Sequence, residues 1–266
     1  MLHVSDDAQH PPPQDLAPAL ARLLARLQRV EKLVLVIPEH HTSIFNTEID
    51  SVHIRLPTVR TLVVGPFCEF AISLCPNVGT ISSNGWNWLH AKAGNRSART
   101  HTQRLIAAAS EAAATVTRFE MMEQWTVDLV EALHDALPNL LKLTLDGGSY
   151  RGGMSAFVPV LSRFERLEYL ALAGPSKLGV SFQPPWCGNA YMGPRGKELR
   201  ERVNRECKEA EAKVTNMVAP ACANLKELWI GERTRVEVLR DEQGGFKDVI
   251  LDRGGNREQV VYYPSP

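Results

Sequence analysis

A four-residue apolar phrase recurs seven times along the chain, and it limits the possible folds more than any other feature. Its members stand three, three and two residues apart, and the last two fall in a short stretch of β-forming residues. Side chains two residues apart point to the same side of a strand. The phrase therefore predicts seven strands, each with one buried side. The copies begin at Leu27, Leu56, Cys75, Ala113, Leu137, Phe164 and Cys222.

A unit of this kind cannot bury its own apolar edge, so neighbouring units must stack on one another. The phrase matches the strand half of a leucine-rich repeat. We therefore predict an α/β fold, an irregular leucine-rich-repeat solenoid, in which a single curved parallel sheet carries helices or loops on its convex side. The residues predicted to point into its core include Leu33, Leu62, Leu143, Leu170 and Leu228.

The repeat domain is expected over residues 15–234, with an insertion over residues 174–220. Residues 1–14 are polar and end in three prolines, which predicts a disordered lead-in. Beyond the last repeat, alternating apolar residues and Gly-containing turns predict an antiparallel β meander over residues 235–263 that caps the sheet. Helices are expected at about residues 15–27, where one would cap the N-terminal end, 102–114, 126–137, 157–164 and 195–218.

The composition argues against two classes of partner. The chain has 30 Lys and Arg and 30 Asp and Glu, so its charge gives no reason to expect nucleic acid or an anionic membrane. The longest purely apolar run, Leu33–Ile37, is far shorter than the roughly 20 residues of a membrane-spanning helix. The first residues also lack the features of a signal peptide. We therefore expect a soluble protein of the cytoplasm or nucleus.

The residue patterns give little support for catalysis. The five cysteines form no Cys-x-x-Cys pair, and His40-His41 has no third ligand at a recognisable spacing. The glycine-rich segment from Gly147 to Gly153 lacks the Lys-Ser/Thr of a phosphate loop. We therefore predict no catalytic residue, no metal, no cofactor and no enzymatic activity. The alternative is an enzyme whose site lies in the insertion at residues 186–194.

Three segments carry a resemblance to a known family. Leu56-Pro57-Thr58-Val59, Cys75-Pro76-Asn77-Val78 and Leu137-Pro138-Asn139-Leu140 resemble the irregular leucine-rich repeats of fungal F-box proteins, over about residues 20–231. The resemblance implies a non-catalytic protein-interaction scaffold, the substrate-recognition part of an F-box-like ubiquitin ligase subunit. The F-box motif itself is not found in this sequence, so its adaptor-binding role is not carried over.

Strand alternation also predicts which residues face outward on the concave side. Trp229, Tyr169 and Met122 are the large side chains on this face, and Trp186 would approach it from the Pro-rich insertion. Residues of these types are enriched in binding hot spots, so the four are the candidate contacts for a protein partner. Two alternatives remain open: the insertion covers the concave face, or Trp186 fixes its own loop to the body. The outward set is Lys32, Val34, Val36, Thr61, Val63, Thr80, Ser82, Asn84, Arg118, Glu120, Met122, Lys142, Thr144, Asp146, Tyr169, Ala171, Glu227 and Trp229.

Overall fold

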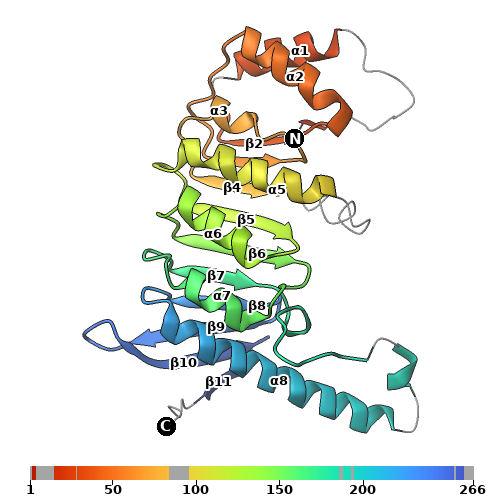
Figure 1. The fold of residues 1–266 in the computed structure, drawn as a ribbon, viewed down its shortest axis with the longest axis vertical. Coiled ribbons are helices and arrows are strands. Elements are labelled where there is room, and N and C mark those ends of the chain that lie inside the picture. Colours follow the sequence, from red (N-terminus) through yellow and green to blue (C-terminus); the bar gives the residue numbers. More distant parts are fainter. Residues whose placement is uncertain are drawn as a thin grey trace. The chain divides into compact units, whose positions relative to one another are not determined.

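The chain forms two compact units in the computed structural model, which describes residues 2–3, 15–27, 29–83, 96–185, 188–192, 195–254 and 256–260 (Figure 1). Unit 1 comprises Met1–Glu123 and Asp135–Leu140, and unit 2 comprises Gln124–His134 and Leu141–Pro266. The boundary between the units falls within one helix, α6 (Val127–Ala136).

Unit 1 is a parallel sheet with helices between its strands. Consecutive strands pair in register, so that Leu33, Leu62, Ile81 and Phe119 form one row across the sheet. The strands are β1 (Leu2–His3), β2 (Lys32–Val36), β3 (Thr61–Val64), β4 (Thr80–Ser83) and β5 (Arg118–Glu123). The helical segments are α1 (Leu16–Arg26), α2 (Glu39–Ser51), α3 (Ala71–Leu74), α5 (Arg96–Ala109) and the 3-10 turn η1 (Ser110–Ala112).

Strand β1 corrects the prediction of a disordered lead-in at its first residues. Leu2 and His3 pair in parallel with Leu35 and Val36 of β2, because the edge of β2 offers free backbone hydrogen-bonding groups. The rest of the predicted lead-in, residues 4–14, lies outside the described part of the chain.

Unit 2 combines parallel and antiparallel strands. Strands β6 (Lys142–Gly147), β7 (Tyr169–Leu172) and β8 (Glu227–Ile230) are parallel, and Leu143, Leu170 and Leu228 form one row. The predicted C-terminal antiparallel strands are present as β9 (Thr234–Arg240), β10 (Phe246–Arg253) and β11 (Asn256–Val260). The remaining elements are α7 (Met154–Leu161), α8 (Gly196–Ala221), and the 3-10 turns η2 (Pro175–Lys177) and η3 (Gly188–Tyr191).

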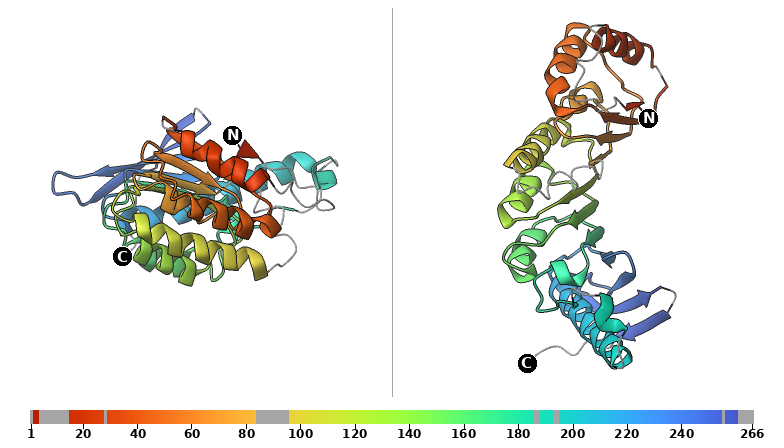
Figure 2. Two further views of the ribbon diagram at one scale, coloured as in Figure 1. Left: turned by 90° about the horizontal axis from the view of Figure 1, so that it is seen from above. Right: turned by 90° about the vertical axis from the view of Figure 1, so that its right-hand side faces the viewer.

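Each of the seven apolar phrases ends in a strand, and burial alternates along each strand as predicted. Residues of β5 and β6, for example, follow the sequence exposed, buried, half-buried, buried, half-buried, buried. Helices lie over the buried face of each unit, while the opposite face carries no helix in the described part of the chain (Figure 2). The fold is therefore α/β, with mostly parallel strands and an antiparallel end.

Val36 is the exception to the alternation. It was predicted to face outward, but only 9% of its surface is exposed. Gly65 explains the difference, because a Cβ atom built on this glycine would lie 3.1 Å from both Cα and Cγ1 of Val36. The backbone of the next connector therefore packs closely on Val36 and covers it. Asn84, another residue of the predicted outward set, lies outside the described residues.

The glycine-rich segment after β6 is an ordered connector. Gly153 has a positive φ of 73°, and a Cβ atom on Gly179 would lie 2.7 Å from its Cα. Neither position can hold a larger residue without moving the backbone. Tyr150 in the same segment is buried and donates its hydroxyl proton to the carbonyl oxygen of Leu145 at 2.5 Å. These glycines therefore allow two backbone segments to meet.

Among the described helices, none combines the length and the apolar composition needed to cross a membrane.

Candidate partner-binding surface

The structure brings two of the four predicted contact residues together. Tyr169 on β7 and Trp229 on β8 are half-buried residues on adjacent strands of unit 2. Met122 lies half-buried on β5 of unit 1. Trp186 lies outside the described residues. The candidate surface is therefore built around Tyr169 and Trp229.

Strand register explains why these two aromatic residues share a face. Tyr169 lies opposite Glu227, and Ala171 lies opposite Trp229. Both aromatic residues therefore occupy outward positions, one row apart. The residue directly opposite Trp229 on β7 is therefore the small Ala171, and Tyr169 is its diagonal neighbour.

A carboxylate holds the indole in place. Trp229 donates its Nε1 proton to Oε1 of Glu227 at 2.6 Å, and Arg235 donates its Nε proton to the same oxygen at 2.8 Å. The Arg235 guanidinium lowers the pKa of the Glu227 carboxyl, the indole N–H lowers it further, and partial burial opposes both effects. Glu227 is therefore ionised at neutral pH and fixes both neighbours.

A cation also lies against the second aromatic ring. The Nζ atom of Lys142 stands 6.0 Å from the centre of the Tyr169 ring, within the range of a cation–π interaction. The positive charge of Lys142 also contributes to the low pKa of Glu227. We call the five residues Lys142, Tyr169, Glu227, Trp229 and Arg235 the outer strip.

Arg235 is the member of the outer strip that the sequence analysis did not identify. It follows the last apolar phrase and lies on the antiparallel strand β9, where Ile230 pairs with Thr234 and Trp229 with Arg235. The alternation of Arg235 and Glu237 with buried Val236 and Val238 is the signal that could have placed it on the outward face.

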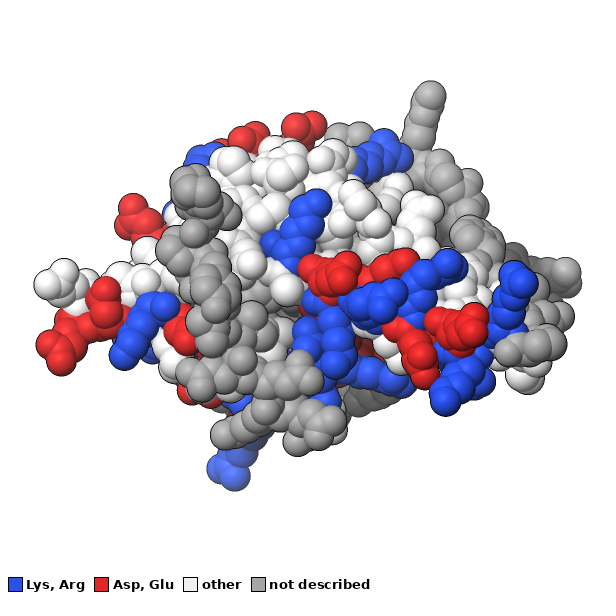
Figure 3. Space-filling view, turned by 90° about the horizontal axis from the view of Figure 1, so that it is seen from below, with Lys and Arg blue, Asp and Glu red and all other residues white. Residues whose placement is uncertain are grey.

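Charges on α8 form a different kind of surface. The exposed residues of its N-terminal half carry both signs, and Arg202 and Glu206 form an ion pair at 3.7 Å. Lys or Arg and Asp or Glu are interleaved on this side of unit 2 (Figure 3). Mixed exposed charges of this kind solvate a helix, and exposed ion pairs contribute little to stability.

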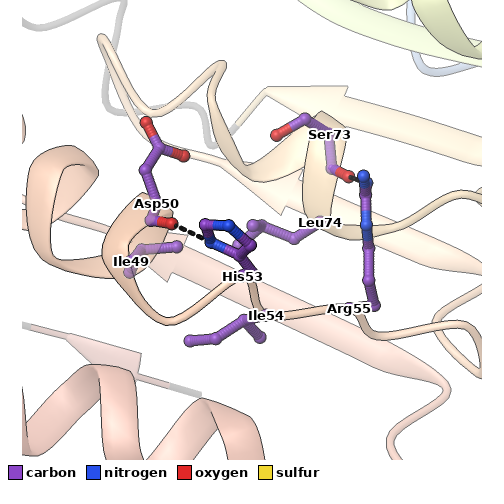
Figure 4. Close-up of a pocket in the computed structure, with 7 residues that line it drawn as sticks. All are labelled: Ile49, Asp50, His53, Ile54, Arg55, Ser73 and Leu74. Carbon is purple, nitrogen blue, oxygen red and sulfur yellow. Dashed lines mark hydrogen bonds between the residues drawn. The ribbon is translucent and has the colours of Figure 1, made fainter.

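Unit 1 contains a pocket of about 420 Å³ between the end of α2 and α3 (Figure 4). Two of its polar side chains bond to the backbone: Nδ1 of His53 donates to the Asp50 carbonyl at 2.7 Å, and Arg55 donates to the Ser73 carbonyl at 2.5 Å. The His53 contact lies at the C-terminal end of α2, and the Arg55 contact attaches the segment that follows α2 to α3. The lining residues are Ile49, Asp50, His53, Ile54, Arg55, Ser73 and Leu74.

A buried histidine in unit 1 is kept neutral. Burial lowers the pKa of His101 from 6.5 to about 4, and the charge of Arg104 lowers it further. The Phe67 backbone N–H donates to Nδ1 of His101 at 2.9 Å, so Nε2 carries the proton of the neutral ring. Nε2 is buried and has no hydrogen-bond partner among the described residues.

The cysteines and possible metal ligands give no further site within the described residues. Burial raises the pKa values of Cys68, Cys75 and Cys222 to about 12, so these thiols are protonated at neutral pH. No three His, Cys, Asp or Glu residues in the described part of the chain lie close enough together to hold a metal ion. Of the alternative enzyme site at residues 186–194, the structure describes residues 188–192.

Comparison with known proteins finds no family model that matches the chain and no similar curated protein.

Proposed function

We propose that this chain is a non-catalytic protein-interaction scaffold, an irregular leucine-rich-repeat solenoid that binds a protein partner through the outer strip. The observation that carries the proposal is the pairing of Tyr169 and Trp229 on a strand face without a covering helix in the described residues. Both rings are large and half-exposed, and polar neighbours restrain them. An interface gains most from rigid aromatic side chains, because little side-chain entropy is lost when they bind.

The resemblance to the repeats of fungal F-box proteins suggests a setting for this function. In that setting the outer strip would recognise a substrate protein of a ubiquitin ligase in the cytoplasm or nucleus. The parallel strands and the buried apolar rows of both units support a repeat architecture. The F-box-like role rests on the three Leu-Pro and Cys-Pro segments alone.

The test is the loss of a partner when the indole is removed. Affinity capture from the cells that produce the protein would compare the wild type with Trp229→Ala, and each recovered partner would then be purified and its affinity measured. We expect Trp229→Ala to weaken binding by about 2 kcal/mol, roughly 30-fold in Kd.

The matched control is Arg202→Ala on the exposed part of α8, which should leave the affinity unchanged. Recovery of the same partners in the same amounts by wild type and Trp229→Ala would refute binding through the outer strip. A wild type that captures no protein but turns over a small molecule would refute the scaffold function itself.

A further inference from the structure

The outward face of unit 2 is acidic, although the whole chain has no net charge. The strand registers place two cationic residues, Lys142 and Arg235, at outward positions of β6–β10. They place five anionic residues there: Asp146, Glu227, Glu237, Asp248 and Asp252. Lys247 is exposed at the bulge of β10, where the register gives it no partner, and counting it leaves the balance acidic.

Two of these carboxylates lie directly opposite each other. Glu227 on β8 pairs with Glu237 on β9. Side chains at opposed positions of an antiparallel pair are neighbours, and like charges there destabilise the sheet. The candidate binding face therefore carries two neighbouring carboxylates at its centre, and the charge of Arg235 interacts with both.

Among the described residues, only Glu227 of this pair is hydrogen-bonded to a cation of the outer strip. Arg235 donates to Glu227, and Lys142 lowers the pKa of the same carboxyl. Glu237 is exposed and has no hydrogen-bond or ion-pair partner among the described residues, although its charge contributes to the raised pKa of Arg235. A cation of a partner can therefore approach the exposed Glu237 carboxylate directly.

The aromatic residues next to this position suit the same kind of group. Trp229 and Tyr169 flank Glu227 on its own strand and on the neighbouring strand. The Tyr169 ring already has an ammonium group 6.0 Å from its centre. Arg and Lys side chains can contact aromatic rings through their cations and aliphatic stems while the charge faces a carboxylate.

We propose that the outer strip binds an extended, basic polypeptide segment, one of whose Arg or Lys side chains lies beside Glu237. The inference rests on the proposed function, and it specifies the chemistry of the partner. A polyanion such as nucleic acid is disfavoured on this face by the same acidic residues. The attraction gives specificity and a faster association rate, and salt weakens it.

The first test uses three fluorescent dodecapeptides, with Thr alternating with Arg, Gln or Glu, and fluorescence anisotropy at 0.15 M salt. We expect the Arg peptide to bind at least tenfold more tightly than the Gln peptide, and the Glu peptide to bind most weakly. Glu237→Gln should weaken binding of the Arg peptide at least threefold. Equal affinities for the Arg and Gln peptides would overturn the inference.

The matched control is Glu209→Gln, which removes the same charge from an exposed position on α8. It should leave the affinity for the Arg peptide unchanged, and an equal loss in both variants would show only a general charge effect and overturn the inference. Thermal unfolding of Glu237→Gln checks its folding. Its Tm should stay close to that of the wild type, because Glu237 is an exposed surface residue.

Selection from an unbiased peptide-display library separates this inference from the proposed function. One outcome would support both the proposed function and this inference. The selected peptides would be rich in Arg or Lys, and they would bind Trp229→Ala and Glu237→Gln more weakly than the wild type. Peptides that depend on Trp229 but carry no excess of basic residues would overturn the inference and leave the proposed function standing. Peptides that bind Trp229→Ala and Tyr169→Ala as well as the wild type would contradict both.

Discussion

At the scale of single residues, His101 shows how burial sets a pH response. Its pKa is about 4 in the folded protein and 6.5 in an ordinary environment, so the unfolded chain takes up the proton first as the pH falls. The stability that depends on the neutral ring is present above pH 6.5 and is lost as the pH falls toward 4. Over this range the free energy of unfolding should fall by roughly 3 kcal/mol.

The variant that tests this response is His101→Gln, whose amide oxygen can still accept the Phe67 N–H proton. Urea unfolding at several pH values should show the wild type losing stability relative to the variant as the pH falls through this range. A constant difference in the free energy of unfolding across the range would show that His101 does not titrate as described.

Leu143 and Lys142 test the inward and outward assignment at neighbouring residues. The Leu143 side chain is fully buried, whereas Lys142 is exposed. Leu143→Ala should lower the free energy of unfolding by about 2 to 5 kcal/mol, because it leaves a cavity. Lys142→Ala should cost at most about 0.5 kcal/mol. Chemical denaturation measures both values, and equal losses would contradict the assignment.

At the scale of elements, a buried ion pair attaches the long helix α8 to the C-terminal strands. Glu211 on α8 accepts a hydrogen bond from the Thr234 hydroxyl at 2.8 Å and pairs with Nε of Arg253 at 2.7 Å. The side chains of Glu211 and Arg253 are 9% and 16% exposed. Removing the cation would therefore leave a nearly buried carboxylate without its main counter-charge.

Arg253→Met should destabilise the protein by about 3 to 5 kcal/mol, because the desolvated carboxylate loses its charged partner. The matched control is Arg202→Met, which breaks an exposed pair on the same helix and should cost less than about 1 kcal/mol. Urea denaturation of the two variants measures the difference. Similar losses would mean that the Glu211 pair does not attach α8 to the strands.

At the scale of the whole molecule, the distribution of charge carries more information than its sum. The chain has 30 basic and 30 acidic residues, which by itself predicts no preferred partner. The strand registers nevertheless collect acidic residues on the outward face of unit 2, while α8 carries both signs. A chain without net charge can therefore present an acidic face.

The sequence was enough to predict the seven parallel strands and the C-terminal antiparallel strands, because alternation and turn residues are local signals. It also placed Tyr169 and Trp229 on the outward side, since side-chain direction follows from position along a strand. It did not predict β1 or the covering of Val36, which depend on a neighbouring edge and on the close approach of Gly65.

Which side chains contact one another depends on how the folded segments align. Register set Trp229 beside Arg235 and Glu227 opposite Glu237, and folding brought His101 to the Phe67 backbone. The physical reason is that these contacts depend on how separate segments align, and a one-residue slip of a strand would reverse the face of every side chain on it. The apolar pattern therefore specified the buried side of each strand, whereas the alignment of the strands built the outer strip.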